Sequence, residues 1–145
     1  METRININSL EPKAYQAMFG LEKYLSSVEL DPTLKELIKV RAAQINGCAY
    51  CIQTHTEQAR KQGETEQRIY ALSAWRESPV FTAEERAVLA LTEEITLIAD
   101  QGLSDATYEQ ALELLGENGV AQCIMQIVAI NAWTRIAVST HMRHE

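Results

Sequence analysis

Two cysteines and a histidine give one short segment of this 145-residue chain its clearest capacity for chemistry. The segment, residues 46–55, reads NGCAYCIQTH. Its Asn-Gly pair is expected to end one helix, so that Cys48 and Cys51 fall in the first turn of the next. Unpaired backbone N–H groups and the positive end of the helix dipole favour an anion at that position. A cysteine thiolate is such an anion, and the spacing therefore indicates thiol chemistry.

His55 is the second component of this chemistry. It follows Cys51 by four residues and Cys48 by seven, so helical periodicity places all three side chains on one face. A free thiol, with a pKa of about 8.5, is only slightly ionised at neutral pH, and the helix dipole lowers that pKa by about half to one unit. An imidazole one turn away can take the thiol proton and hold the thiolate as an ion pair. The spacing thus predicts a dithiol activated by His55.

Glu36 is the candidate for a third group, one that would orient the histidine. In the helix expected over residues 32–46, it lies on neither the core stripe nor the solvent stripe. Two small residues follow it on the same face, which would let a neighbouring helix approach. If the two helices fold back at residues 46–47, Glu36 lies about 16 Å up one and His55 about 10 Å up the other, at about 1.5 Å per residue. We therefore predict a Glu36, His55, Cys51 relay, closed directly or through one water.

Structural explanations of the cysteine pair also exist. The pair could be inert, or it could be part of a zinc site. With His55 it offers three metal ligands where structural zinc requires four, and the chain has no second C-x-x-C. Cysteines in a chain without an export signal are expected to be reduced, which favours a catalytic pair over a structural disulfide. We predict redox chemistry with no metal and no cofactor.

The remaining candidate side chains are expected to be structural. Cys123, alone in the apolar last helix, is predicted to be a small buried hydrophobe. His141 and His144 belong to a tail that we expect to be solvated. Trp75 and Trp133 have apolar neighbours at helical spacing, and we expect them to pack in the core or in an interface.

The elements that would position these groups are all helical. Pro12 and Pro32 suit first helical positions, and Thr82 followed by Glu85 is typical of a capping box. No run shows the apolar alternation of a half-buried strand, and the connections are short. We predict an all-α fold, a compact bundle of about six to seven helices in a single domain, residues 1–145. The expected helices are residues 12–27, 32–46, 48–62, 65–76, 83–101, 105–116 and 119–141.

Composition narrows the setting in which the protein works. The formal net charge is -7 and the 13 Lys and Arg residues are dispersed, which disfavours a nucleic-acid partner and an anionic membrane surface. The first residues lack a signal-peptide pattern, so we expect a cytoplasmic protein. The most apolar stretch, residues 120–138, is interrupted by polar residues, which favours a buried helix over a membrane span. Because that helix is apolar on nearly every side, we expect it to be covered in a homo-oligomer.

The segment from Glu36 to His55 resembles the AhpD-like alkylhydroperoxidases of the carboxymuconolactone decarboxylase family. The most specific features are a Glu twelve residues before a C-x-x-C and a His four residues after it. A looser similarity includes AVLALTE at residues 87–93 and NAWTRIA at residues 131–137. The resemblance implies an AhpD-like all-α fold and an oligomer, either a trimer or a hexamer.

By that resemblance, Cys51 attacks a hydroperoxide substrate and becomes a sulfenic acid, Cys48 resolves it as a disulfide, and Glu36 and His55 relay protons. Attack requires a thiolate, and a nearby second thiol condenses with the sulfenic acid before further oxidation. The resemblance also implies a dithiol reductant, which in the family is a lipoyl-type carrier. One position departs from the pattern. Established peroxidases of the family have a histidine directly before the second cysteine, where this chain has Tyr50, whose hydroxyl could reach the site or face solvent.

Two other functions remain open. A non-catalytic thiol redox sensor or scaffold would oxidise once and stop, whereas a peroxidase turns over with excess peroxide. A carboxymuconolactone-decarboxylase-type activity is suggested by the wider family, but the decarboxylases resembled here lack the C-x-x-C pair. We therefore predict a thiol-dependent peroxidase with Cys51, Cys48, His55 and Glu36 as its catalytic residues.

Overall fold

The computed structural model describes residues 1–144, and all of its regular elements are helical. Over this range the chain forms eight α-helices and one short 3-10 helix, η1, without any strand. The elements are α1 (Ile7–Leu10), α2 (Pro12–Ser27), α3 (Pro32–Asn46), α4 (Ala49–Lys61), α5 (Glu66–Ala71), η1 (Leu72–Ala74), α6 (Ala83–Thr96), α7 (Ile98–Gln101) and α8 (Asp105–Thr140). The predicted all-α class is confirmed.

The predicted helix limits hold best near the cysteine pair. Helices α2 and α3 have the predicted bounds, and α4 is one residue shorter at each end. The helix predicted over 83–101 is divided at Leu97, whose φ of -96° and ψ of 37° leave the helical region. The two helices predicted last are joined in α8, but Gly116, with φ 69° and ψ 173°, interrupts the helical backbone there. The predicted break is therefore present at the residue that favours it.

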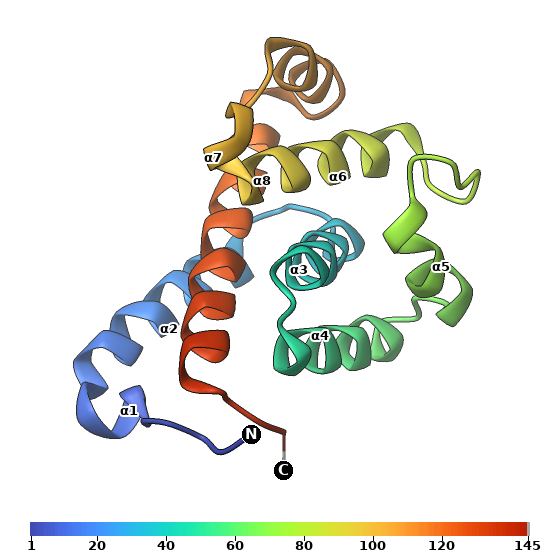
Figure 1. Cartoon of the computed structure of the whole chain (residues 1–145). Helices are drawn as coiled ribbons and strands as arrows, with labels where there is room; N and C mark the ends of the chain where they lie inside the picture. The colour runs from blue at the N-terminus through green and yellow to red at the C-terminus, as the bar shows by residue number, and fades with distance from the viewer. Residues whose placement is uncertain (145) are drawn as a thin grey trace.

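Helix α3 lies at the centre of the bundle. Figure 1 shows it nearly end-on, with α6 on one side, α4 on the other and α8 passing beside them, and it contacts all three. Its buried stripe includes Leu34, Leu37 and Ile38. On the face toward its neighbours, Ala42 and Ala43 are fully buried and leave room for close helix packing. The sequence thus builds a rigid central helix that also carries Glu36.

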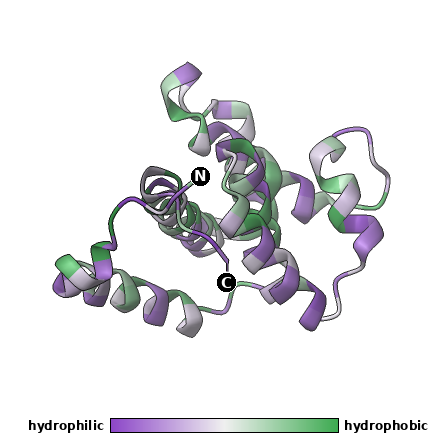
Figure 2. Cartoon of the chain, turned by 60° about the horizontal axis from the view of Figure 1, so that its bottom comes forward, coloured by the Kyte–Doolittle hydropathy of each residue, from purple (hydrophilic) through white to green (hydrophobic). Residues whose placement is uncertain are grey.

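The main apolar core is formed largely by α3, α6 and α8. Ile38, Val88, Leu91, Ile127 and Ile130 are among its buried members. Figure 2 shows hydrophobic residues gathered toward the middle of the bundle, with hydrophilic residues on the outer turns. All three cysteines belong to this core cluster. The thiols therefore lie at the edge of a packed apolar interior.

Helix α8 is long and apolar enough to satisfy simple criteria for a membrane-spanning helix. The core helix of a water-soluble bundle satisfies the same criteria, and α8 packs here against α3 and α6. Val128 and Val138 are exposed on its outer side. Other helices of the same chain thus cover one side of α8. That further copies of the protein cover the exposed side stays a prediction.

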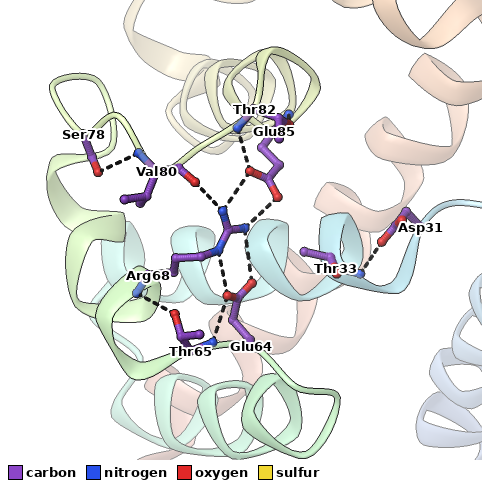
Figure 3. Close-up of polar contacts among 9 residues, drawn as sticks. All are labelled: Asp31, Thr33, Glu64, Thr65, Arg68, Ser78, Val80, Thr82 and Glu85. Carbon is purple, nitrogen blue, oxygen red and sulfur yellow. Dashed lines mark hydrogen bonds and ion pairs between the residues drawn. The ribbon is translucent and has the colours of Figure 1, made fainter.

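Arg68 connects α5 to the start of α6 through a network of charges, shown in Figure 3. Its guanidinium donates to Glu85 Oε1 at 2.6 Å, to Glu64 Oε1 at 2.7 Å and to the Val80 carbonyl. Glu85 also accepts from the Thr82 N–H at 2.8 Å, which completes the predicted capping box. The hydrogen bonds to Glu85 and Glu64 raise the pKa of Arg68 despite its partial burial. Every charge in this network is paired.

A second network fixes the outer side of α3 to α6. Glu93 Oε1 accepts hydrogen bonds from Trp75 Nε1 at 2.7 Å and from Arg41 Nη2 at 2.9 Å, and Glu93 Oε2 accepts one from Arg76 at 2.8 Å. Burial raises the pKa of Glu93, but these three donors outweigh it and the net pKa is lowered. Trp75 is buried, as predicted for a core residue.

Candidate active site

The turn between α3 and α4 places the cysteine pair. Gly47 has φ 65°, a left-handed conformation that favours glycine, and the Cys48 N–H donates to the Ala43 carbonyl at 3.0 Å. Asn46 Nδ2 donates to Asn131 Oδ1 at 3.0 Å and to Thr134 Oγ1 at 2.9 Å, which holds the turn against α8. The predicted helix break is therefore confirmed. The contact with α8 had no signal in the local sequence.

Cys48 and Cys51 lie in the first turn of α4, as predicted, and their sulfur atoms form a disulfide with Cα atoms 5.3 Å apart. Cys48 is the N-cap residue, and its Sγ accepts the Cys51 N–H at 3.3 Å. One of the unpaired amides at the helix start is thus directed at sulfur. Cys48 is 1% exposed and Cys51 3% exposed. Access to either sulfur must therefore come through a specific opening.

The structure brings Glu36 of α3 to His55 of α4. His55 Nδ1 lies 3.6 Å from Glu36 Oε2, and Lys39 Nζ donates to Glu36 Oε1 at 3.0 Å. Glu36 is 4% exposed, and its partner Lys39 is itself partly buried. The back-folding of the two helices, inferred from the small residues on the shared face, accounts for this contact.

Glu36 is held as a carboxylate by its contacts with His55 and Lys39. Burial raises the pKa of its carboxyl group, but the contacts with His55 and Lys39 outweigh burial and leave the net pKa lowered. At 3.6 Å the His55 contact has ion-pair distance rather than hydrogen-bond distance, and Glu36 Oε2 has no other partner. This buried oxygen therefore retains capacity to accept a proton or a hydrogen bond.

An aromatic cavity of about 320 Å³ opens beside Cys51. Its wall includes both Cys51 and His55, one helical turn apart. Its lining also includes a cluster of three rings, in which Tyr15 packs edge-to-face on Trp133, with centroids 5.4 Å apart, and Phe19 contacts both. Trp133 thus lines a cavity, and its predicted packing in an interface stays a prediction. The cavity provides an apolar approach to the Cys51 sulfur.

A second, more polar cavity of about 440 Å³ also borders His55. Glu36, Lys39 and Gln126 line it together with His55. Gln126 is 2% exposed, and its Nε2 has no hydrogen-bond partner. Within residues 1–144, the buried side-chain N and O atoms without a partner are Gln126 Nε2 and Glu36 Oε2, and both residues border this cavity. His55, with Glu22 and Thr54, therefore borders both an apolar approach to sulfur and a more polar space.

The expectation that His144 is solvated is wrong. Its ring stacks on Tyr50 with centroids 4.4 Å apart, and its Nε2 lies 2.9 Å from Thr54 Oγ1 and 3.1 Å from the Tyr50 carbonyl oxygen. His141 is also engaged, with Nδ1 3.2 Å from the Glu2 carbonyl. These contacts join residues about 90 or more positions apart, so helical periodicity carried no signal for them. Tyr50 itself lines the aromatic cavity.

Cys123 is fully buried in α8, and burial raises its pKa to about 12. The predicted role as a small apolar residue is confirmed. Within residues 1–144, no group of three or more His, Cys, Asp or Glu side chains could hold a metal ion. Cys48, Cys51, His55 and Glu36 are the candidates for the chemistry of this site.

Comparison with known proteins identifies the lineage of this site. The sequence model of the carboxymuconolactone decarboxylase family matches residues 12–94, more than half of the chain and all four of these side chains. The protein belongs to the carboxymuconolactone decarboxylase family. Among family relatives, the uncharacterized protein YdfG of Bacillus subtilis (strain 168) is 41% identical over 139 residues, covering 96% of this chain and 95% of YdfG.

Solved structures place this family member among AhpD-like proteins. A crystal structure from Agrobacterium tumefaciens, of a protein of unknown function named as a candidate antioxidant defence protein AhpD, is 40% identical. It superposes with a TM-score of 0.96 over 99% of both chains. An uncharacterized peroxidase-related protein of Silicibacter sp. TM1040, 21% identical, shares the fold with a TM-score of 0.79, covering 88% of this chain and 68% of that one.

Proposed function

We propose that the protein is a thiol peroxidase that reduces hydroperoxides through Cys51 and Cys48. The observation that carries the proposal is the position of His55. It shares the aromatic cavity with Cys51 on one side and contacts Glu36 at 3.6 Å on the other, while Cys48 is bonded to Cys51. Cys48, Cys51 and His55 of α4 and Glu36 of α3 thus supply a resolving thiol, an attacking thiol, a base and a carboxylate on two packed helices.

The first step forms a sulfenic acid on Cys51. In the reduced protein, His55 takes the Cys51 proton, and the thiolate attacks the terminal oxygen of the hydroperoxide. The O–O bond breaks, Cys51 gains the hydroxyl as Cys–SOH, and the alkoxide takes the proton from His55 to leave as an alcohol. Glu36 stabilises the imidazolium that exists between these two proton transfers, because its carboxylate lies at Nδ1.

The second step resolves the sulfenic acid. Cys48 attacks the Cys51 sulfur, the disulfide forms, and the hydroxyl leaves as water with the Cys48 proton. The two Cα atoms are 5.3 Å apart and the Cys48 sulfur already lies 3.3 Å from the Cys51 amide, so the bond forms within one helical turn. Little rearrangement is required between the two states, which suits repeated turnover.

Regeneration requires two electrons from a dithiol, which attacks the disulfide and leaves as its own cyclic disulfide. We assign this role to a lipoyl-type carrier in the cytoplasm, because the disulfide is nearly inaccessible to a folded protein surface. The exposed valines of α8, Val128 and Val138, support assembly as a homo-oligomer, with a trimer or hexamer as the expected forms. Sedimentation of the purified protein tests the assembly separately from the chemistry.

A redox sensor is the competing function. The disulfide joins positions 48 and 51 within a single turn, so oxidation does not fasten separate helices together. A sensor needs such a change to alter a partner surface, and the local disulfide favours turnover instead. Excess hydroperoxide with a dithiol reductant distinguishes the two, since a sensor stops after one equivalent and a peroxidase continues.

Substitution of each cysteine tests the assigned roles. Cys51→Ser is expected to abolish hydroperoxide turnover, and Cys48→Ser to allow one oxidation that stops at the sulfenic acid. Cys123→Ala is the matched control, because Cys123 is buried away from the cavity and should leave turnover unchanged. Unchanged turnover in Cys51→Ser would refute the proposal.

A further inference from the structure

The segment after α8 crosses to the first turns of α4. Helix α8 ends at Thr140, and His141, with φ 53°, turns the chain so that the Met142 N–H donates to the Ala137 carbonyl at 2.9 Å. Residues 142–144 then lead to Tyr50, on which His144 stacks. Figure 1 shows this end of the chain beside the N-terminus at the foot of α8.

The two ends of this segment are held very differently. The start is fixed by backbone hydrogen bonds and by residues 2–4, including the Arg4 N–H to the Thr140 carbonyl at 2.9 Å. The far end is held by the His144 side chain alone among the hydrogen bonds of residues 142–144 to α4. Because Nε2 faces the Tyr50 carbonyl, which can only accept, that nitrogen carries a hydrogen. Removal of the His144 side chain is therefore expected to release the far end of residues 142–144 from α4, while the hydrogen bonds at Met142 and Thr140 keep the start of the segment in place.

Met142, in the middle of this segment, forms part of the wall beside Cys51. It lines the aromatic cavity, and it also lines a neighbouring cavity of about 510 Å³ between the N-terminal residues and the end of α8. Tyr15 is the other residue that borders both spaces, and it is fixed on α2. Moving Met142 would thus join the two cavities, while Tyr15 would stay in place.

We propose that His144 is a specificity-determining residue, which fastens residues 142–144 across the aromatic cavity and so limits the size of molecule that reaches Cys51. With the segment fastened, small hydroperoxides enter the cavity of about 320 Å³. Bulky ones require its release, which joins this cavity to the neighbouring one. The identity of the substrate as a hydroperoxide rests on the proposed function, whereas the size limit itself does not.

Thiol alkylation tests the size limit without any peroxide. The full-length protein is reduced, freed of reductant and treated with N-ethylmaleimide or with the much larger fluorescein maleimide, and modification of Cys51 is followed by peptide mass spectrometry. Loss of the Nε2–H shared between the Tyr50 carbonyl and Thr54 Oγ1, together with loss of the stacked ring, in His144→Ala shifts the segment toward its released position by roughly 5- to 30-fold. The fluorescein maleimide rate should rise by about that factor, and the N-ethylmaleimide rate by less than about twofold.

Two further variants make the result decisive. Thr54→Val removes one of the two His144 partners and should give the same selective change, to a smaller extent. Ser139→Ala, at an exposed position near the end of α8 that lines neither cavity, is the matched control and should leave both rates as in the wild type. Equal rates in His144→Ala and the wild type, or equal acceleration of both reagents, would overturn the inference. If His144→Ala changes the alkylation rates selectively but the wild type does not turn over hydroperoxide, the size limit stands and the proposed peroxidase function is refuted.

Discussion

Glu85 and Glu36 are both buried carboxylates at helix–helix contacts, yet they are satisfied to different degrees. Glu85 receives Arg68 on both oxygens and the Thr82 N–H as well. Glu36 has Lys39 on one oxygen, and on the other it has His55 at 3.6 Å with no hydrogen bond. The two residues are 8% and 4% exposed, so burial does not explain the difference.

The comparison indicates which buried charge holds the fold and which serves chemistry. Loss of a fully paired carboxylate leaves a buried cation without a partner. A carboxylate with a free oxygen is less useful for stability, but it can respond when the charge on a neighbouring imidazole changes. Glu85 is thus assigned to structure and Glu36 to the site, and each assignment can be tested separately.

Arg68→Met should have the largest effect on stability. The change leaves Glu85 and Glu64 without their shared cation, which should cost about 2–4 kcal/mol, less than for a fully buried pair because Arg68 is partly exposed. Urea unfolding measures the loss. The rate of Cys51 alkylation in the folded protein should not change. A stability loss below about 0.5 kcal/mol would contradict the structural role of this network.

Glu85→Gln and Glu36→Gln form a matched pair with opposite expected outcomes. Glu85→Gln should destabilise the protein by about 1–3 kcal/mol and leave Cys51 reactivity unchanged, because a charged partner of Arg68 is lost. Glu36→Gln should have the smaller stability effect and should raise the pKa of Cys51, because His55 holds its proton less firmly. Urea unfolding and alkylation rates measure both. Similar results for the two variants would remove the distinction.

Thr82→Ala should cost about 1 kcal/mol, a typical value for the loss of an N-cap side chain. The Thr82 hydroxyl accepts the Glu85 N–H at 3.2 Å, so this change weakens the start of α6 while Arg68 keeps its partners. Thermal unfolding measures the effect. An effect as large as that of Arg68→Met would show that the cap, rather than the charge network, dominates this region.

The smallest expected effect is the pH dependence contributed by Glu36. Its pKa is lowered on folding, so its ionisation stabilises the folded state above the unfolded pKa, near 4.5, and this stabilisation is lost as the pH falls through the folded-state pKa. The stability difference between the wild type and Glu36→Gln should therefore be present at neutral pH and shrink below about pH 5. A difference that grows on acidification would have the wrong sign.

The sequence could predict the parts of the site that depend on helical spacing. The register of Cys48, Cys51 and His55 follows from one helix, and the contact with Glu36 follows from small residues on the facing helix. The helix break at Gly47 followed from local chemistry in the same way. These features depend on periodicity and on residue size, both of which are visible in a single chain.

The surroundings of the site could not be predicted in this way. His144 reaches Tyr50 across about 90 positions, and the aromatic cavity brings Tyr15 of α2 to Trp133 of α8. Such contacts depend on how helices from both ends of the chain pack together. The partner-free amide of Gln126 likewise becomes visible only once the polar cavity is formed. The residues proposed to carry the chemistry thus follow from spacing within two neighbouring helices, whereas the residues that enclose the site come from distant parts of the chain.

The most direct test of the account is the pKa of Cys51 in the reduced protein, obtained from its alkylation rate by iodoacetamide across a pH series. The account predicts a midpoint at least about one unit below the ordinary thiol value of about 8.5, moved upward by about one unit in His55→Ala and by less in Glu36→Gln. A Cys51 midpoint near 8.5 in all three proteins would contradict activation by His55, and with it the proposed chemistry.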